Sequence, residues 1–383
     1  MNNFKKIFAI LLAAIMLISA AGCGSKPDYS YKTDNVSYAE GVYLYSLFSA
    51  YNEAYSILQE SLGDKFDSTA SILDITSTFD ETGEKLLCET WIKDQADLIT
   101  RNLAALDEKV AEYGITLDKT QVESARQLAK EDWYLGPYYE YYVASGYEAV
   151  SYEDMLSPYG ISFDSFFTSS YLASVKQSAI FDHLYGKGGE EEVSDKEITD
   201  YFTQNYTSYA YFIVNLYETA IDEETSQQVY HPYSDELVND VKEELDSYVK
   251  LINSGKDYTE IANKYVKAHN LTNDPTVKNI EILDNSALGE EVLNALKGLD
   301  EGKATYIKVG SGDTSVMYFI TKFDINNEAE EYLSADGNRH TILQALKSED
   351  FSNYLDDITE NVVVDINEKV IEKYNPAIFE KDL

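Results

Sequence analysis

Residues 194–216 constrain the fold more than any other stretch, because their hydrophobic period changes from helical to extended. Ser194 and Glu197 have the spacing of a capping box, in which each side chain satisfies a backbone N–H at the start of a helix. Residues 210–214 form a short apolar, β-branched and aromatic run, which is typical of a central strand. We therefore expect a capped helix that leads directly into a buried strand.

A run of glycines and acids over residues 186–192 precedes that helix and predicts a domain boundary. The chain of 383 residues has room for two or three domains, since one core seldom grows beyond about 250 residues. Apolar residues recur at helical intervals before the run, whereas helix-like and strand-like segments alternate after it. We predict an α+β protein with a helical N-terminal domain over residues 37–189, a small α/β domain over 190–328, and a C-terminal helix and strand over 329–383 that return to the helical domain.

Two long amphipathic helices are expected in the N-terminal domain. The first follows another capping-box spacing, Ser37 with Glu40, and a polar loop over residues 63–80 comes after it. Apolar residues between 88 and 113 form the stripe of the second helix. Cys88 lies on this stripe, so we interpret it as a small core residue and not as a reactive thiol.

Two similar phrases mark further helix junctions: Tyr-Gly-Ile-Thr-Leu-Asp begins at Tyr113, and Tyr-Gly-Ile-Ser-Phe-Asp begins at Tyr159. In each, glycine ends one helix and a hydroxyl residue with an acid starts the next. Between them lies an aromatic segment, residues 133–147, in a chain with 33 tyrosines. We expect these rings in the core, because helical hairpins need bulky residues. The alternative is an aromatic surface for unfolded or proline-rich chains.

The segments after residue 216 alternate between helical and extended patterns and end in a hairpin with a Gly-Ser-Gly-Asp turn. The expected elements are a polar loop at 218–233, helices at 237–252 and 258–265, a strand at 279–283, a helix at 288–299, strands at 303–309 and 314–323, a helix at 342–358 and a strand at 362–364.

The first residues have the pattern of a secretory signal with lipid attachment. Two lysines precede an apolar run, and small residues stand directly before Cys23. We predict a signal peptide over residues 1–22, lipid on Cys23, and a flexible tether over 23–36. The chain would then be anchored on the extracytoplasmic side of the cell membrane by acyl chains. The alternative is an ordinary signal peptide cleaved nearby.

Charge and composition exclude several classes of site. The net charge is −38, and removal of the signal with its two lysines makes it more negative, so nucleic acid is not an expected partner. With Cys23 lipidated, Cys88 is the only thiol, which excludes a disulfide or a cysteine zinc site. No metal site and no cofactor are expected, although carboxylates in 218–224 or 349–357 leave calcium open without EF-hand spacing. We interpret the four histidines as surface or packing residues: His183, His231, His269 and His340.

The order of these elements, together with the lipid-attachment signal, resembles a parvulin-type peptidyl-prolyl isomerase domain within a secreted foldase of the PrsA and SurA kind. The resemblance covers most of the mature chain and rests on three phrases, which are Val193-Ser194-Asp195-Lys196-Glu197-Ile198, Gly255-Lys256-Asp257-Tyr258 and Leu299-Asp300-Glu301-Gly302. It implies a chaperone-like helical domain, a parvulin-like α/β domain, and a membrane-anchored folding factor whose partners are unfolded or nascent secreted polypeptides.

The reactive residues of the family do not carry over. Parvulins have one histidine on the first strand and one near the end, and these positions correspond to Phe212 and Phe319. The Asp or Cys of the middle strand corresponds to Asn279, and the Met and Phe of the proline pocket correspond to Leu288 and Val292. The resemblance therefore implies no confident catalytic residue, and a substrate-binding set made of the two phenylalanines with the leucine and the valine.

Prolyl isomerisation must lower a barrier of about 18–20 kcal/mol that comes from amide resonance. A catalyst does so with a desolvated pocket and well-placed hydrogen bonds, and phenylalanine has neither a donor nor an acceptor. We expect Phe212 and Phe319 to fill the core of the sheet, with isomerase activity weak or absent. Two alternatives stay open: an active prolyl isomerase with an atypical pocket, and a lipoprotein that binds a solute or a surface partner.

Overall fold

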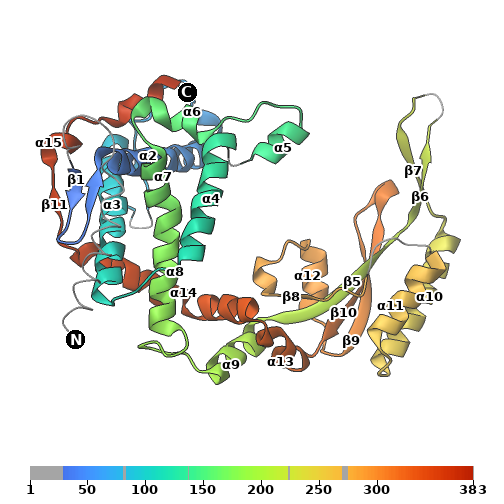
Figure 1. The fold of residues 1–383 in the computed structure, drawn as a ribbon. Helices are drawn as coiled ribbons and strands as arrows, with labels where there is room; N and C mark the ends of the chain where they lie inside the picture. The colour runs from blue at the N-terminus through green and yellow to red at the C-terminus, as the bar shows by residue number, and fades with distance from the viewer. Residues whose placement is uncertain (1–28, 81–82, 137, 223–224, 270–274, 383) are drawn as a thin grey trace. The chain divides into compact units, whose positions relative to one another are not determined.

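The computed structural model describes residues 29–80, 83–136, 138–222, 225–269 and 275–382, and it divides into two compact units (Figure 1). Unit 1 contains the residues up to Glu192 and those from Lys347 onward; unit 2 is Val193–Leu346. Cys23 and the signal over 1–22 lie outside the described residues. Among the described helices, none is long and apolar enough to cross a membrane. The predicted α+β class is confirmed, with helices dominant in unit 1 and a mixed sheet-and-helix unit 2.

Two long helices form the centre of unit 1, α2 (Glu40–Leu62) and α3 (Cys88–Glu112). Their apolar stripes are buried together, as the periodicity predicts. Cys88 is completely buried on this stripe, and burial raises the pKa of its thiol to about 12. The expected core role of this cysteine is confirmed.

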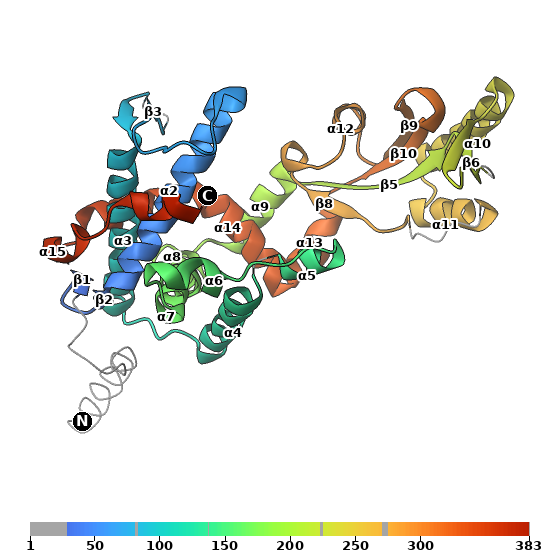
Figure 2. The same cartoon turned by 90° about the horizontal axis from the view of Figure 1, so that it is seen from above.

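Three short strands join the N-terminal and C-terminal ends of the described chain in unit 1. The sheet has the order β11-β1-β2, with β1 at Tyr29–Lys32, β2 at Ser37–Ala39 and β11 at Asp365–Ile366. Tyr31 pairs with Ile366, so the predicted return to the helical unit is confirmed for the end of the C-terminal segment. Residues 329–346 of that segment belong instead to unit 2. Figure 2 shows the C-terminal segment lying across α2.

This sheet corrects three expectations. The tether predicted over 23–36 is wrong from residue 29, because Tyr31 is buried and its hydroxyl donates to Asp97 at 2.5 Å. The capping box at Ser37 does not form, since pairing with β1 draws this serine into β2 and Ala39 is the N-cap of α2. The strand expected at 362–364 is misplaced by a few residues, because Val363 is 87% exposed and the pairing begins later.

The loop predicted over 63–80 is largely correct but includes a short helix, η1 (Gly63–Lys65), and a strand, β3 (Thr76–Thr78), paired with β4 (Lys85–Leu87). The two predicted helix junctions are confirmed. Gly114 and Gly160 adopt φ values of 63° and 85°, which favour glycine, and Asp118 and Ser162 cap the helices that follow.

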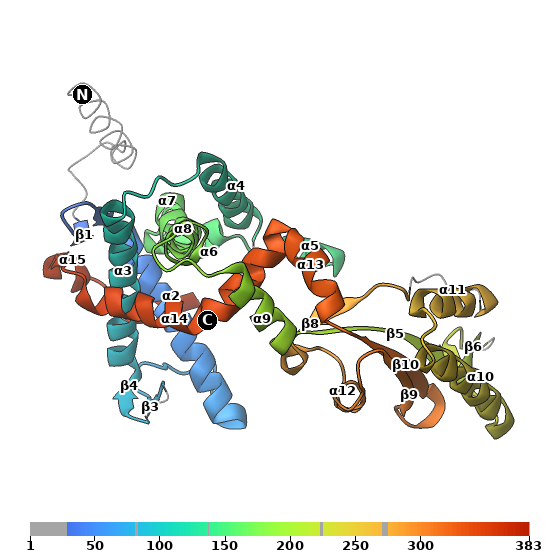
Figure 3. The ribbon, with the colours of Figure 1, turned by 90° about the horizontal axis from the view of Figure 1, so that it is seen from below.

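Among the remaining helices of unit 1, α7 packs against α2 and α8 packs against α3. The end of α14 meets α3 where Asn102 donates to Thr359 at 2.9 Å (Figure 3). The elements are α4 (Lys119–Leu135), α5 (Tyr139–Ala144), α6 (Tyr152–Leu156), η2 (Ser157–Tyr159), α7 (Phe163–Phe167), the π-helix η3 (Thr168–Leu172), α8 (Ala173–Tyr185), α15 (Glu368–Ile371) and η6 (Pro376–Asp382). Of α14 (Asp336–Asn361), the part from Lys347 onward belongs to unit 1.

Unit 2 is built on a four-stranded antiparallel sheet of order β8-β5-β10-β9. Helix α9 (Asp195–Asn205) begins with the complete capping box of Ser194 and Glu197 and leads into β5 (Thr207–Asn215), as predicted. The other predicted strands and helices of this unit are also present. They are α10 (Asp235–Asn253), α11 (Tyr258–His269), β8 (Asn279–Glu281), α12 (Glu290–Lys297), β9 (Lys303–Val309) and β10 (Val316–Phe323). Three further elements were not predicted: the short turns η4 (Leu283–Asn285) and η5 (Gly312–Thr314), and the helix α13 (Asn326–Ser334).

The polar loop expected at 218–233 is instead a hairpin of β6 (Tyr217–Ile221) and β7 (Gln228–Pro232), which leaves the sheet as a two-stranded ribbon (Figure 1). Its polar sequence misled the prediction, since both faces of an exposed ribbon are wet and apolar alternation is weak. The Asp222 carboxylate accepts the Thr225 backbone N–H at 2.8 Å and helps to close the turn.

Candidate functional site

The sheet of unit 2 separates the site residues predicted from the sequence into two groups. Phe212 on β5 lies directly opposite Phe319 on β10, and both side chains are buried against α10 and α11. Their ring centroids are 4.7 Å apart with planes 13° apart, and Tyr265 of α11 stacks on Phe212 at 4.3 Å. The two phenylalanines therefore lie in the middle of a dry aromatic core.

Leu288 and Val292 belong to the opposite face of the same sheet. Leu288 lies just before α12 and Val292 lies on this helix, and both belong to an apolar cluster with Tyr209 of β5 and Ile320 of β10. Successive residues of a strand point to opposite faces, so Phe212 and Phe319 cannot share a pocket with this pair. The structure brings the phenylalanines together and the two aliphatic residues together, but it does not unite the four.

Asn279 lies on β8 and pairs with Tyr209 of β5, where it is half-buried. Strand β8 pairs with β5 only from Thr207 to Tyr209. The Tyr209 hydroxyl donates to Glu281 at 2.5 Å, and burial together with this contact raises its pKa well above the ordinary value. The polar groups near Asn279 thus hold an edge strand in place.

The α12 face continues beyond the helix as an apolar strip, which we define as Tyr211, Ile213, Ile307, Val309 and Tyr318. The rings of Tyr211 and Tyr318 lie 5.5 Å apart, and Ile213 is 37% exposed. The strip residues were not predicted as a site, although each tyrosine stands next to Phe212 or Phe319 in the sequence and alternation places it on the other face of the sheet. The strip can hold an apolar chain by packing.

Two histidines, His183 and His269, make local side-chain contacts. In unit 2 the His269 ring nitrogen lies 3.2 Å from both oxygens of Glu244, which also accepts the Tyr248 hydroxyl. In unit 1 His183 stacks on Tyr113 at 4.4 Å. Over the residues that the structure covers, no three His, Cys, Asp or Glu side chains are grouped to hold a metal ion.

The aromatic segment of unit 1 corrects the expectation that its tyrosines fill the core. We define the aromatic arm as residues 134–136 and 138–150, which include α5. Only Trp133, just before the arm, is buried in the core, at 2% exposure. The large apolar side chains of the arm are between 39% and 69% exposed: Tyr134, Leu135, Tyr138, Tyr139, Tyr141, Tyr142, Val143, Tyr147 and Val150.

The arm has a closed base and an open tip. Gly136 has φ +88°, and a Cβ atom there would lie 2.4 Å from the carbonyl oxygen of Val150, so the chain leaves and returns at one place. Ser151 then caps α6, and Trp133 packs on Phe166 at 5.5 Å. This is the geometry of an Ω-loop, and none of the residues of α5 is buried. In Figure 1, α5 lies beyond the end of α4.

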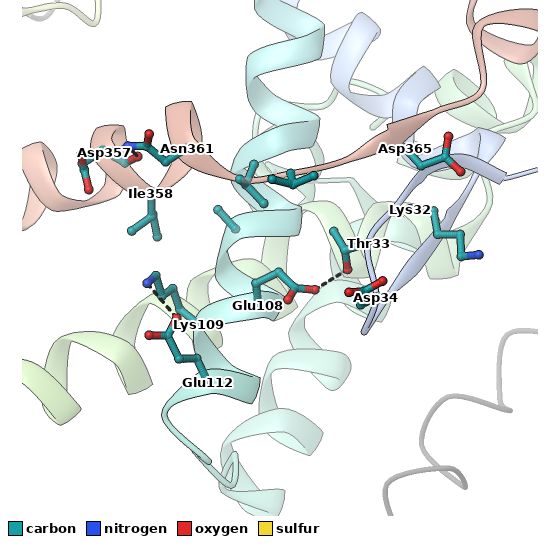
Figure 4. Close-up of a pocket in the computed structure, with 13 residues that line it drawn as sticks. Lys32, Thr33, Asp34, Glu108, Lys109, Glu112, Asp357, Ile358, Asn361 and Asp365 are labelled. Carbon is teal, nitrogen blue, oxygen red and sulfur yellow. Dashed lines mark hydrogen bonds and ion pairs between the residues drawn. The ribbon is translucent and has the colours of Figure 1, made fainter.

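A pocket of about 490 Å³ lies in unit 1 between β1, α3 and the end of α14 (Figure 4). Two of its acidic residues are held by neighbouring side chains. Glu108 accepts the Thr33 hydroxyl, and Lys109 donates to Glu112 at 2.8 Å. We interpret this pocket as a solvated crevice whose polar contacts tie the N-terminal strand to α3.

No protein-family model and no curated protein matches the sequence. Among solved structures, the foldase protein PrsA from Streptococcus pneumoniae aligns over 78% of this chain and 97% of its own, with 14% identity and a TM-score of 0.34. PrsA from Lactococcus lactis aligns over 91% and 99%, with 10% identity and a TM-score of 0.33. PrsA from Bacillus subtilis aligns over 73% and 93%, with 12% identity and a TM-score of 0.23. Similarity at these scores does not establish a common fold.

Proposed function

We propose that this chain is an extracytoplasmic folding factor that holds non-native polypeptides on the aromatic arm of unit 1. Lipid on Cys23 anchors it to the outer side of the cell membrane. The observation that carries the proposal is the exposure of the arm, where nine large apolar side chains are solvated on a segment with a fixed base.

Exposed apolar side chains on one segment are unusual in a soluble protein and mark a surface that a partner covers. Tyrosine suits an unspecific partner, because its ring offers a large contact area with little side-chain entropy to lose, and its hydroxyl bonds to any exposed backbone. Each contact between a tyrosine ring and an aromatic ring of the client contributes roughly 0.5–1.5 kcal/mol beyond the buried area. A few such contacts give weak, reversible binding, which a factor that must release its client requires.

Unit 2 provides a second apolar surface, the strip around Tyr211, Ile213 and Tyr318. We propose that this strip binds a segment of the client. We also propose that unit 2 catalyses prolyl isomerisation weakly or not at all. The positions aligned with the two histidines, Phe212 and Phe319, have no hydrogen-bonding group and are buried on the opposite face. A proline-limited refolding reaction should therefore not be accelerated even at high protein concentration, and clear acceleration would favour an atypical isomerase.

The arm is tested by aggregation of a urea-denatured client diluted into buffer. We expect the wild-type chain to suppress light scattering and the variant with Tyr138→Ser, Tyr141→Ser and Tyr147→Ser to lose most of this effect. The matched control is Tyr230→Ser, an exposed tyrosine on the β7 ribbon. The proposal fails if the wild-type chain leaves aggregation unchanged, or if the triple variant protects as well as the wild type.

A further inference from the structure

The aromatic arm lies in a stretch of the chain without a basic side chain. No lysine or arginine occurs between Lys130 and Lys176, in a chain where 68 acidic residues already outnumber 30 basic ones. The arm itself carries two acids, Glu140 between Tyr139 and Tyr141, and Glu148 directly after Tyr147. The arm therefore combines exposed aromatic rings with two acids and has no basic residue of its own.

The two carboxylates of the arm differ from the acids near its base. Asp132 accepts the Tyr171 hydroxyl, Asp154 accepts the Ser151 hydroxyl, and Asp164 pairs with Arg126 at 2.7 Å. Glu140 and Glu148 are exposed, and within the described chain neither makes a hydrogen bond or an ion pair. The acids near the base bond to other side chains of unit 1, whereas the two carboxylates of the arm are available to a partner.

A tyrosine ring beside a free carboxylate recognises a cation in two ways at once. An ammonium or guanidinium group over the ring face is attracted by its quadrupole, and it can donate to the carboxylate at the same time. Arginine exploits both better than lysine, because its planar group stacks on a ring and its fork matches a carboxylate.

Charge also decides between the possible occupants of the arm. A second copy of this chain would bring the same acidic arm or another part of a strongly acidic surface, and anionic lipid would repel it as well. An unfolded chain with basic residues among its apolar ones meets both features of the arm. We infer that the arm selects cationic segments of unfolded polypeptides and prefers arginine to lysine; this inference rests on the proposed function and specifies its client.

The experiment uses the complete mature chain and unstructured fluorescent peptides that share the same apolar residues. Three spaced positions carry Arg in one peptide, Lys in a second, Ser in a third and Asp in a fourth. We expect the arginine peptide to bind about tenfold more tightly than the aspartate peptide in low salt, with lysine between, and salt to reduce the difference. Fluorescence anisotropy gives the four dissociation constants.

The matched variants separate charge from apolar contact. Glu140→Gln with Glu148→Gln should abolish the preference for arginine and leave the serine peptide unaffected. The control pair Glu60→Gln with Glu123→Gln removes two exposed acids away from the arm and should keep the preference. The three tyrosine substitutions should weaken all four peptides.

The binding results separate the preference for cationic clients from client binding itself. If all peptides bind equally and the glutamine variants change nothing, the client inference is wrong while the proposed function stands. If no peptide binds, the proposed function fails. Arm-dependent dimerisation in sedimentation experiments without a client, or arm-dependent binding to anionic vesicles, would identify another occupant and overturn the inference.

Discussion

Phe212 and Phe319 stack face to face across two neighbouring strands, with ring centroids 4.7 Å apart. These are the positions at which the resemblance to parvulins calls for a histidine pair. Tyr265 continues the stack on the α11 side at 4.3 Å, and Tyr248 approaches Phe319 edge-on at 6.4 Å. The four rings form a core in which each aromatic side chain supports the next, and neither phenylalanine has a group that could bond to an imidazole.

Restoring the histidine pair should therefore damage the fold and not create an isomerase. Phe212→His with Phe319→His removes stacked apolar area and buries two imidazoles without partners, which we expect to cost about 2–4 kcal/mol for each substitution. Urea denaturation followed by circular dichroism measures the loss. Ile213→His, on the neighbouring position that faces the solvated strip, is the matched control and should change stability by less than about 1 kcal/mol. A stable double variant with new prolyl isomerase activity would contradict this account.

The closed base of the aromatic arm predicts a difference between two glycines. Gly136→Ala adds a Cβ atom 2.4 Å from the Val150 carbonyl oxygen at a φ of +88°, so the arm must shift. Gly146→Ala has a similar backbone angle, φ +77°, but no atom within 4 Å of the added carbon. We expect Gly146→Ala to cost about 1 kcal/mol and to keep client binding, whereas Gly136→Ala costs more and weakens binding several-fold. Peptide anisotropy and urea denaturation on both variants measure this, and equal effects would show that the base does not position the arm.

The buried ion pair of unit 1 should be sensitive to removal of one partner. Lys176 on α8 lies 2.6 Å from Asp107 on α3, with both side chains largely buried, and the same carboxylate accepts the Tyr38 hydroxyl. Lys176→Met leaves that carboxylate uncompensated, which we expect to lower the unfolding free energy by about 3–5 kcal/mol. Adding Asp107→Asn should recover part of the loss in a double-mutant cycle. Lys119→Met, at an exposed position, is the control; if it destabilises as much as Lys176→Met, burial of the pair is not the cause.

Cys88 should be inert in the folded chain. Burial raises the pKa of its thiol from 9.0 to about 12, so the fold favours the protonated form. The stabilisation that comes from the raised thiol pKa is complete below pH 9, the pKa of the thiol in the unfolded chain. It is lost as the pH rises toward 12, the pKa in the folded chain. In a Cys23→Ser background, a disulfide reagent at pH 8 should react only after denaturant is added. The stability of this chain should also fall more steeply above pH 9 than that of its Cys88→Ala derivative, and rapid labelling of the native protein would contradict the assignment.

Local signals predicted much of the fold. The capping box of Ser194 and the left-handed glycines 114 and 160 depend on interactions within a few residues, so a single sequence contains them. Ser37 has the same local spacing but lies in a strand, because it pairs with β1 in a sheet that β11 completes from the other end of the chain. Long-range pairing overrode a correct local pattern there.

The candidate surfaces were harder to predict for two physical reasons. Alternation along β5 predicts that Phe212 and Tyr211 point to opposite faces of the sheet. Only the position of α12, which covers part of the Tyr211 face, shows that this face stays partly exposed to solvent. The tyrosines of the arm have the composition of a core, and their exposure depends on the closure of the chain at Gly136, which no apolar pattern records. Hydrophobicity indicates that a side chain will be covered, but not by what.

The pairing of Tyr31 with Ile366 has a consequence for the order in which the chain is made. Synthesis proceeds from the N-terminus, and the whole of unit 2 is complete before β11 exists. Unit 2 can therefore acquire its fold while unit 1 still waits for its last strand. A chain that stops before Asp365 would contain all of unit 2 but would lack the strand that pairs with β1, so such a truncation should destabilise unit 1 and leave unit 2 folded.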